Sequence, residues 1–181
     1  AICRRHDLWF HIDGAYGAPA ILSARYRDAL GGLALADSVG LDPHKWLSIP
    51  VEAGLVLVRD KAAMRAAFSL VAPYLPVGDT PTGVTGLPWF SEYGFQQSRG
   101  FRALKVWMAL RPHGLGGYAA AIEHDLALAA RLAAAIAAAP DLALAAEPSL
   151  SIVCFRYRPP GRAAGDLDAL NRAVLEAVQL G

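Results

Sequence analysis

Residues 36–48 read Ala-Asp-Ser-Val-Gly-Leu-Asp-Pro-His-Lys-Trp-Leu-Ser, an apolar run that ends in a polar turn. The turn presents His44 and Lys45 next to each other. Lysine is strongly hydrated and is rarely placed at the end of a buried strand. Where burial makes such an amine available, it can form a Schiff base with a carbonyl compound; otherwise a lysine in this place is a solvated turn residue.

A second strand followed by a turn lies upstream. Residues 8–17 read Leu-Trp-Phe-His-Ile-Asp-Gly-Ala-Tyr-Gly, so an apolar run ends in Asp13 and small residues. Two strands joined by a helix with short connections form a right-handed βαβ unit, and ligands bind at the carboxyl ends of such strands. Asp13 and Lys45 are therefore expected at one edge of a sheet, where a carboxylate and an amine can hold a pyridinium ring and bind its aldehyde.

Together these stretches resemble the pyridoxal-phosphate-dependent group II amino-acid decarboxylases, which include aromatic-L-amino-acid, histidine, glutamate and diaminobutyrate decarboxylases. The resemblance is carried by His-Ile-Asp-Gly-Ala-Tyr-Gly at 11–17, Ala-Asp-Ser at 36–38 and Asp-Pro-His-Lys-Trp at 42–46. Residues 98–107 resemble the family's Ser-Arg-Arg-Phe-x-Ala-Leu-Lys-x-Trp segment, with Gly100 in place of the second arginine. The resemblance implies an α/β fold, namely fold type I of the pyridoxal-phosphate-dependent transferases (aspartate-aminotransferase-like).

The resemblance also implies roles for four residues around a pyridoxal 5'-phosphate cofactor. Asp13 would pair with the ring nitrogen, and the small Ala15 would let the ring lie close to the backbone. Lys45 would form the internal aldimine, and His44 would contact the phosphate. The ordinary alternatives are a strand-end cap for Asp13, turn packing for Ala15 and a backbone-bonded core histidine for His44. Asp42 is not assigned to the cofactor, because a carboxylate beside the phosphate would repel it.

Residues 71–89 are rich in proline and glycine and show no periodicity, which is typical of a functional loop or a floppy connector. Residues 67–75 resemble the start of the family's mobile catalytic loop, and Tyr74 lies at the position of its tyrosine. After carbon dioxide leaves, a phenol can supply or relay a proton to the α-carbon. In related aldehyde synthases this tyrosine is phenylalanine, so Tyr74 favours simple decarboxylation.

The remaining pattern predicts the order of strands and helices. We expect strands over 8–13, 33–41, 54–58 and 151–157, and helices over 23–30, 59–70, 101–111, 118–139 and 167–180. Residues 8–13 are continuously apolar, as in a parallel strand covered on both faces. We place a boundary near Leu115. Residues 1–115 are then the C-terminal part of the large cofactor-binding domain, and residues 116–181 the beginning of the small domain.

Composition narrows the classes of partner. The 181 residues hold 17 Lys and Arg against 16 Asp and Glu, which gives no electrostatic reason to expect nucleic acid or an anionic membrane as a partner. The two cysteines imply no disulfide framework and favour a cytoplasmic location. No stretch reads as a membrane span or a leader. His11, Asp13 and His44 are too weak a pattern for a metal site.

We therefore expect decarboxylation of an L-amino acid, aromatic in the first instance, to the amine and carbon dioxide. The alternatives are a glutamate or diaminobutyrate decarboxylase, another reaction on the same cofactor such as transamination or carbon–sulfur lyase chemistry, or an inactive truncated fragment that cannot hold the cofactor. Beside the family, the chain is expected to be an internal fragment without the upstream phosphate-binding loop. The family also implies a homodimer with the site at the subunit interface.

Overall fold

The computed structural model describes residues 2–69 and 90–181. The chain divides into two compact units, Ala1–Leu115 and Gly116–Gly181. Each unit is described by itself. Their identification as parts of a large cofactor-binding domain and a small domain stays a prediction.

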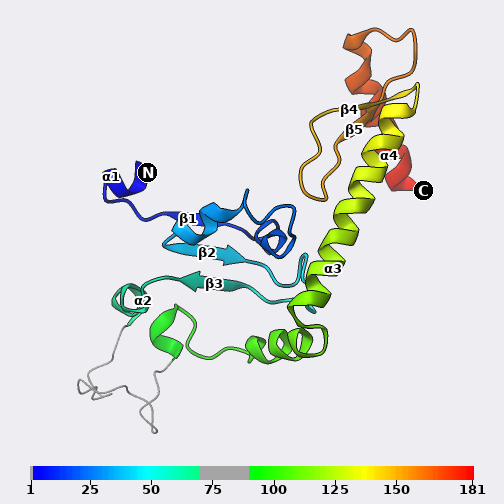
Figure 1. Cartoon of the computed structure of the whole chain (residues 1–181). Helices are drawn as coiled ribbons and strands as arrows, with labels where there is room; N and C mark the ends of the chain where they lie inside the picture. The colour runs from blue at the N-terminus through cyan, green and yellow to red at the C-terminus, as the bar shows by residue number, and fades with distance from the viewer. Residues whose placement is uncertain (1, 70–89) are drawn as a thin grey trace, which may run out of the picture. The chain divides into compact units, whose positions relative to one another are not determined.

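The first unit contains a three-stranded sheet in the order β1-β2-β3 (Figure 1). A short helix, α1 (Ile2–Arg5), precedes β1 (His11–Asp13), and β2 (Ser38–Leu41) runs parallel to it with Asp13 opposite Gly40. β3 (Leu55–Val58) runs antiparallel to β2 with Leu41 opposite Leu55. The predicted parallel pair is confirmed, and β1 and β2 end at the same edge of the sheet. The predicted third strand is confirmed as β3.

The connection between β1 and β2 differs from the predicted helix. It consists of two 3-10 helices, η1 (Ala18–Leu22) and η2 (Gly31–Leu35), with turns between them. The predicted helix over 23–30 is wrong, since the Ser23 hydroxyl accepts a hydrogen bond from the Arg25 amide and so favours a local turn. The strand predicted over 33–41 begins only at Ser38, because residues 33–35 belong to η2.

The predicted burial of the first strand on both faces is also wrong. Leu8 is 57% exposed and Trp9 53% exposed, and β1 alternates between exposed and half-buried residues. β1 is an edge strand of the described sheet, so one side of it has no neighbouring strand among residues 2–69 and 90–181. A continuous apolar run does not reveal which neighbours a strand will have.

Polar side chains reinforce the start of the parallel pair. The Asp37 carboxylate accepts a hydrogen bond from the Phe10 amide at 2.7 Å, and the Asp37 amide donates to the Phe10 carbonyl at 2.8 Å. The buried Ser38 hydroxyl lies 2.8 Å from the Trp9 indole nitrogen and 2.7 Å from His11 Nδ1. Asp37, directly before β2, and Ser38, its first residue, therefore help to fix the register of the parallel pair.

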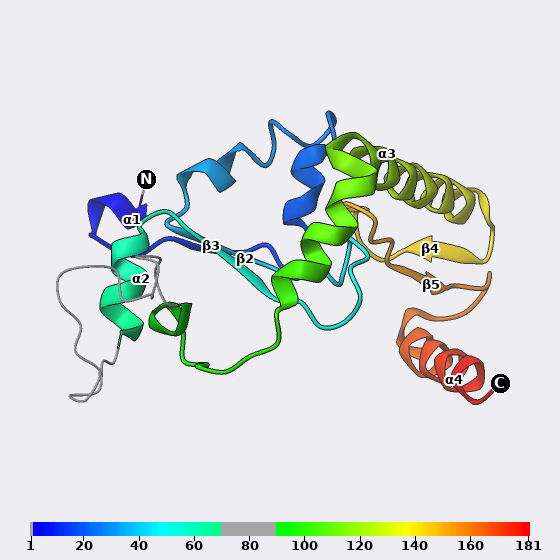
Figure 2. The ribbon, with the colours of Figure 1, turned by 90° about the horizontal axis from the view of Figure 1, so that it is seen from below.

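Two helices follow the sheet. The predicted helix after β3 is α2 (Lys61–Phe68), and Asp60 caps it by accepting a hydrogen bond from the Ala62 amide at 2.8 Å. α2 packs beside η3 (Phe90–Tyr93), the short green helix of Figure 2. Arg65 and the buried Glu92 form an ion pair of 2.7 Å between these helices.

Helix α3 (Arg102–Ala138) contains the predicted break. Gly114 has φ +61° and ψ 177°, a left-handed conformation that glycine adopts readily, and Pro112 lies just before it. Residues up to Leu115 belong to the first unit and the rest to the second. In the second unit the buried residues of α3 repeat at helical spacing and form one apolar stripe: Tyr118, Ile122, Leu126, Ala129 and Ile136.

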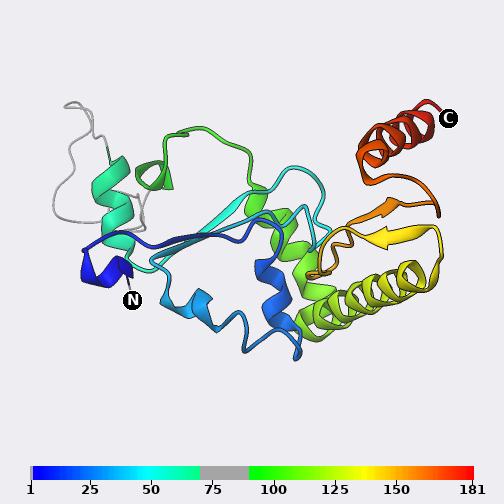
Figure 3. The same cartoon turned by 90° about the horizontal axis from the view of Figure 1, so that it is seen from above.

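The second unit also holds an antiparallel pair and a final helix (Figure 3). β4 (Leu142–Leu144) pairs with β5 (Phe155–Tyr157), and η4 (Ala164–Asp166) leads into α4 (Leu167–Leu180), whose predicted bounds are confirmed. The Asn171 side chain bonds both the amide and the carbonyl of Tyr157 at 2.8 Å, which ties α4 to β5. The strand predicted over 151–157 is shorter than expected, and β4 was not predicted because it has only three residues.

Among the helices of residues 2–69 and 90–181, none combines the length and the apolarity needed to cross a bilayer.

Gly14 offers a test of how tightly the turn after β1 is packed. A Cβ atom at this position would lie 2.5 Å from the Ala18 Cβ and 3.1 Å from the Gly40 carbonyl oxygen. We expect Gly14→Ala to lower the free energy of unfolding by about 1–3 kcal/mol, since a packed backbone must move. Urea denaturation followed by tryptophan fluorescence measures this change.

Gly32→Ala is the matched control, because a Cβ atom there has no neighbour within 4 Å. It should change the free energy of unfolding by about 0.5 kcal/mol or less. Equal effects of the two substitutions would show that the turn after β1 is not closely packed.

Candidate functional site

The turns that follow β1 and β2 are joined to each other. The Gly14 amide donates to the Gly40 carbonyl at 3.0 Å, and the Asp42 amide donates to the Ala15 carbonyl at 3.1 Å. The rings of Tyr16 and Trp46 stack with centroids 4.7 Å apart and an interplanar angle of 14°. The two turns that carry the predicted site residues therefore form one surface at the carboxyl edge of the parallel pair.

Asp13 and Ala15 lie in the first of these turns. One carboxylate oxygen of Asp13 accepts a hydrogen bond from the Ala15 amide at 3.0 Å, an arrangement typical of an Asx turn. The predicted strand-end cap is thus formed. Asp13 is exposed at the end of β1, and because an ionised carboxylate accepts at both oxygens, this cap does not exhaust its capacity.

Lys45 is held by a neighbour that the sequence left unassigned. Its Nζ lies 2.8 Å from Oδ2 of Asp42, and the two side chains are 45% and 30% exposed. The hydrogen bond from Lys45 lowers the pKa of the Asp42 carboxyl against the opposing effect of desolvation. Asp42 therefore faces Lys45. The sequence indicated this contact only through the positions of Asp42 and Lys45, three residues apart in one turn.

The backbone around Lys45 is well fixed although its side chain reaches solvent. Pro43 and Ile49 are buried, and the Ile49 amide donates to the Pro43 carbonyl at 3.1 Å. The Lys45 amide donates to the Asp42 carbonyl at 2.9 Å, and its own carbonyl accepts from Ser48 at 3.0 Å. The lysine is thus presented from a rigid turn.

His44 is half-buried and is bound through one ring nitrogen. Nδ1 lies 2.8 Å from the Ala53 carbonyl oxygen and 3.2 Å from the Ala53 amide nitrogen. A protonated Nδ1 donates to the carbonyl, and an unprotonated one accepts from the amide, so the tautomer decides which bond forms. His44 is thus bonded to the backbone through Nδ1, as the ordinary alternative predicted. Its other ring nitrogen, Nε2, is separated from Nδ1 by Cε1.

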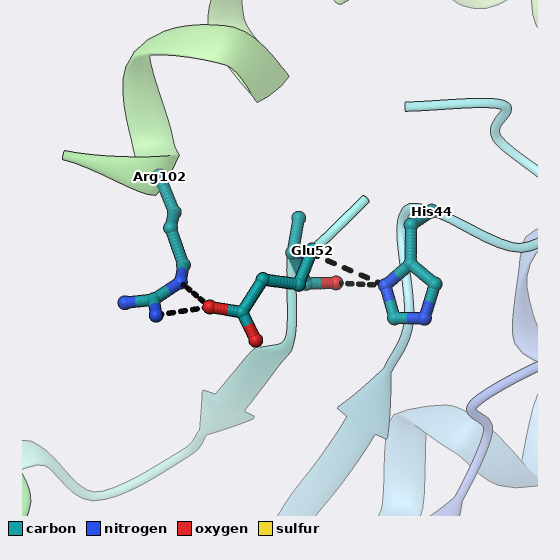
Figure 4. Close-up of polar contacts among 4 residues, drawn as sticks. His44, Glu52 and Arg102 are labelled. Atoms are coloured by element: carbon teal, nitrogen blue, oxygen red, sulfur yellow. Dashed lines mark hydrogen bonds and ion pairs between the residues drawn. The ribbon is translucent and has the colours of Figure 1, made fainter. Parts of the chain in front are cut away.

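An ion pair lies next to this contact and was not foreseen. Arg102, at the start of α3, donates to Glu52 from Nε at 2.8 Å and also from Nη2 (Figure 4). Arg102 lowers the pKa of the Glu52 carboxyl most strongly, and the charges of Lys105 and His44 add to this effect. Glu52 directly precedes Ala53, but nothing in its sequence position indicated that α3 would supply its partner.

Tyr74 lies outside the described residues. Within residues 2–69 and 90–181, no group of three or more His, Cys, Asp or Glu side chains is placed to hold a metal ion. A cavity of about 520 Å³ lies elsewhere in the first unit, and none of the predicted site residues lines it. Its walls are Trp9, Ser38, Val56, Val58, Ala63, Met64, Ala67, Phe68, Tyr93, Gly94, Phe95, Gln96 and Arg99.

Comparisons with known proteins show which family the chain is related to. A family model described as the pyridoxal-dependent decarboxylase conserved domain matches residues 1–158. The chain is 38% identical over 178 residues to an aromatic-L-amino-acid decarboxylase of Bacillus atrophaeus, a match that covers 98% of the chain. It is 34% identical over 175 residues to an L-2,4-diaminobutyrate decarboxylase of Acinetobacter baumannii, which covers 97% of the chain.

Solved structures share the fold. The crystal structure of Oryza sativa TDC with PLP and tryptamine matches with a TM-score of 0.86 at 25% identity, over 97% of the chain and 36% of that structure's chain. The chain spans 37% of the length of the Bacillus relative and 34% of the Acinetobacter relative. The predicted fold type I is therefore confirmed.

The ion pair between Asp42 and Lys45 predicts how Asp42 titrates. Because Lys45 lowers the Asp42 pKa in the folded chain, the pair stabilises the fold at pH values above the ordinary 3.8, and this contribution is lost as pH falls through the lowered value. The carboxyl resonance of Asp42 should titrate below 3.8 in the unaltered chain and move back up in Lys45→Gln.

Carbon-13 NMR of the carboxyl groups measures both midpoints. Lys105→Gln is the control, since Lys105 makes no ion pair with Asp42 and its loss should leave the midpoint in place. Identical midpoints in the unaltered chain and in Lys45→Gln would show that the ion pair does not form.

Proposed function

This chain belongs to the pyridoxal-dependent decarboxylase family, and we propose that it acts in the decarboxylation of an L-amino acid to the amine and carbon dioxide. The cofactor of this reaction is pyridoxal 5'-phosphate. The observation that carries the proposal is the joining of the two turns by the Gly14–Gly40 and Ala15–Asp42 hydrogen bonds. This joining brings the turn with the carboxylate and the turn with the amine to one edge of the sheet.

The residues at this edge fit the chemical groups of the cofactor. They supply an exposed carboxylate for a ring nitrogen, a small side chain beside it, an imidazole, and an exposed primary amine for an aldehyde. When bound, pyridoxal phosphate supplies an electron sink that takes up the bonding electrons of the substrate's α-carbon. The donor set of the two turns therefore matches the group that the family name implies.

Each residue has a defined task in this proposal. Asp13 keeps the ring nitrogen protonated, since a carboxylate favours a positive charge beside it. Ala15 leaves space for the ring above the backbone. Lys45 would leave Asp42, lose its ammonium proton and bond the aldehyde carbon, with the carbonyl oxygen released as water. His44, with Nδ1 accepting from the Ala53 amide, would offer its Nε2 proton to the phosphate.

Tyr74 is proposed as the group that delivers a proton to the α-carbon after carbon dioxide has left. Its place in residues 67–75, which resemble the start of the family's catalytic loop, supports this role. A tyrosine in this position favours the amine as product over an aldehyde.

An aromatic amino acid is the proposed substrate, because the aromatic-L-amino-acid decarboxylase of Bacillus atrophaeus has the higher identity of the two relatives compared above. Glutamate and diaminobutyrate are the competing substrates of the same family. We also propose a homodimer with the site at the subunit interface and a cytoplasmic location. The cytoplasmic location is supported by the free state of Cys3 and Cys154.

Trapping with borohydride tests the assignment of Lys45. Mixing the chain with pyridoxal phosphate and borohydride should leave a reduced adduct on the peptide that contains Lys45, which peptide mass spectrometry identifies. Lys45→Gln should lose this adduct, while the control Lys105→Gln should keep it. If no lysine of the unaltered chain carries an adduct, the chain is an inert fragment and the proposal fails.

Tyr74→Phe tests the protonation step. In a chain that turns over, the substitution should lower amine formation by about 10²–10⁴-fold, the range expected for loss of a general acid, while the Lys45 adduct still forms. Chromatography of amine and aldehyde products measures this change. Unchanged amine output would remove Tyr74 from the mechanism.

A further inference from the structure

We propose that the Arg102–Glu52 ion pair is a positioning device for His44, which it acts on through the backbone of Ala53. The inference rests on the proposed function, because His44 matters as the residue beside Lys45. Neither Arg102 nor Glu52 is assigned to the cofactor site, and both would act through His44. Figure 4 shows Glu52 between the Arg102 guanidinium and the His44 imidazole.

His44 bonds directly to the backbone of Ala53. Both polar groups of the Ala53 backbone lie within hydrogen-bond distance of Nδ1, at 2.8 Å for the carbonyl and 3.2 Å for the amide. Ala53 is 1% exposed, so water does not compete for these groups. The orientation of the imidazole therefore follows the position of the Ala53 backbone.

The backbone of Ala53 is anchored by the ion pair of the preceding residue, Glu52, with Arg102. Glu52 precedes Ala53 and is exposed, so burial does not hold its side chain in place. Arg102 holds it with two donors on one carboxylate oxygen, from the first turn of a helix far along the chain. Two charge-assisted donors on one oxygen hold the position of that oxygen more strongly than a neutral hydrogen bond does. The ion pair thus fixes the residue next to the His44 contact.

Charged side chains lie near His44 and near the carboxylate of Glu52. Among the described residues, His44 acts electrostatically on Asp42 from its own turn, which pairs with Lys45, and on Glu52 from the segment before β3. The histidine contributes to the lowered pKa of the Glu52 carboxyl, after Arg102 and Lys105 from α3. Pairing with Arg102 occupies this carboxylate.

The consequence for the site is a fixed ring edge. With Nδ1 accepting from the Ala53 amide, Nε2 carries the ring proton, has a constant direction and can donate to an anionic group without reorganisation. Preorganised donors of this kind bind anions better than mobile ones, because less conformational entropy is lost. The ion pair would therefore strengthen binding of pyridoxal phosphate without touching it.

Nitrogen-15 NMR of the cofactor-free chain gives a direct test. A neutral imidazole held in one tautomer by a bond at Nδ1 shows two well-separated nitrogen resonances. In Arg102→Gln and Glu52→Gln these resonances should move toward each other as the tautomers average. Arg102→Lys should retain most of the separation, since it keeps the charge and one donor.

Arg65→Gln is the matched control, because it removes another ion pair of the first unit, with Glu92, that involves neither Ala53 nor His44. It should leave the His44 resonances unchanged. Binding of pyridoxal phosphate, measured by titration of the Lys45 adduct, should weaken by roughly threefold to tenfold in Arg102→Gln, about the effect of one modest hydrogen bond. Arg65→Gln should not weaken it.

Two results would overturn the inference: His44 resonances that do not respond to Arg102→Gln, or resonances that respond equally to Arg65→Gln. The NMR readout needs no cofactor, so it stands apart from the proposed function. If the unaltered chain forms no Lys45 adduct, the decarboxylase proposal fails while the positioning of His44 is still decided by its resonances.

Discussion

The structure of the site depends on two backbone hydrogen bonds, from the Gly14 amide to the Gly40 carbonyl and from the Asp42 amide to the Ala15 carbonyl. They continue the pairing of β1 and β2 beyond the ends of the strands. Because they involve only backbone groups, the turns are joined whatever their side chains do, and the side chains of Asp13 and Lys45 project from a fixed frame. Gly14 makes the first bond possible, since a larger residue would meet Ala18.

The sequence predicted those parts of the fold in which a strong local pattern and the tertiary structure agree. The parallel pair, the break at Gly114 and the helix Leu167–Leu180 all follow from apolar spacing or from a glycine. The segment between β1 and β2 was predicted wrongly because Ser23 forms a turn with its own neighbours where a helix cap was expected. The exposure of Leu8 and Trp9 could not be foreseen, since it depends on which elements cover the two faces of the sheet.

The site residues were likewise predicted only in part from the sequence. Asp13, Ala15, His44 and Lys45 were named from two short motifs, and the structure brings their turns together. The strand-end cap of Asp13 and a backbone partner for His44 were foreseen as alternatives, whereas the charged partners around them were not assigned. Asp42 was set aside on grounds of charge, yet its carboxylate binds Lys45. The link from Arg102 through Glu52 and Ala53 to His44 spans three separate parts of the chain. Motifs identify groups that react, whereas the groups that orient them come from contacts distant in sequence.

The central claim is that Asp13 and Lys45 act on one ring. Nitrogen-15 NMR of the chain loaded with pyridoxal phosphate labelled at the ring nitrogen tests it most directly. The account predicts a protonated ring nitrogen in the unaltered chain and an unprotonated one in Asp13→Asn, with the adduct on Lys45 in both. The same ring-nitrogen resonance in both chains would show that Asp13 does not face the ring that Lys45 binds, and would contradict the account.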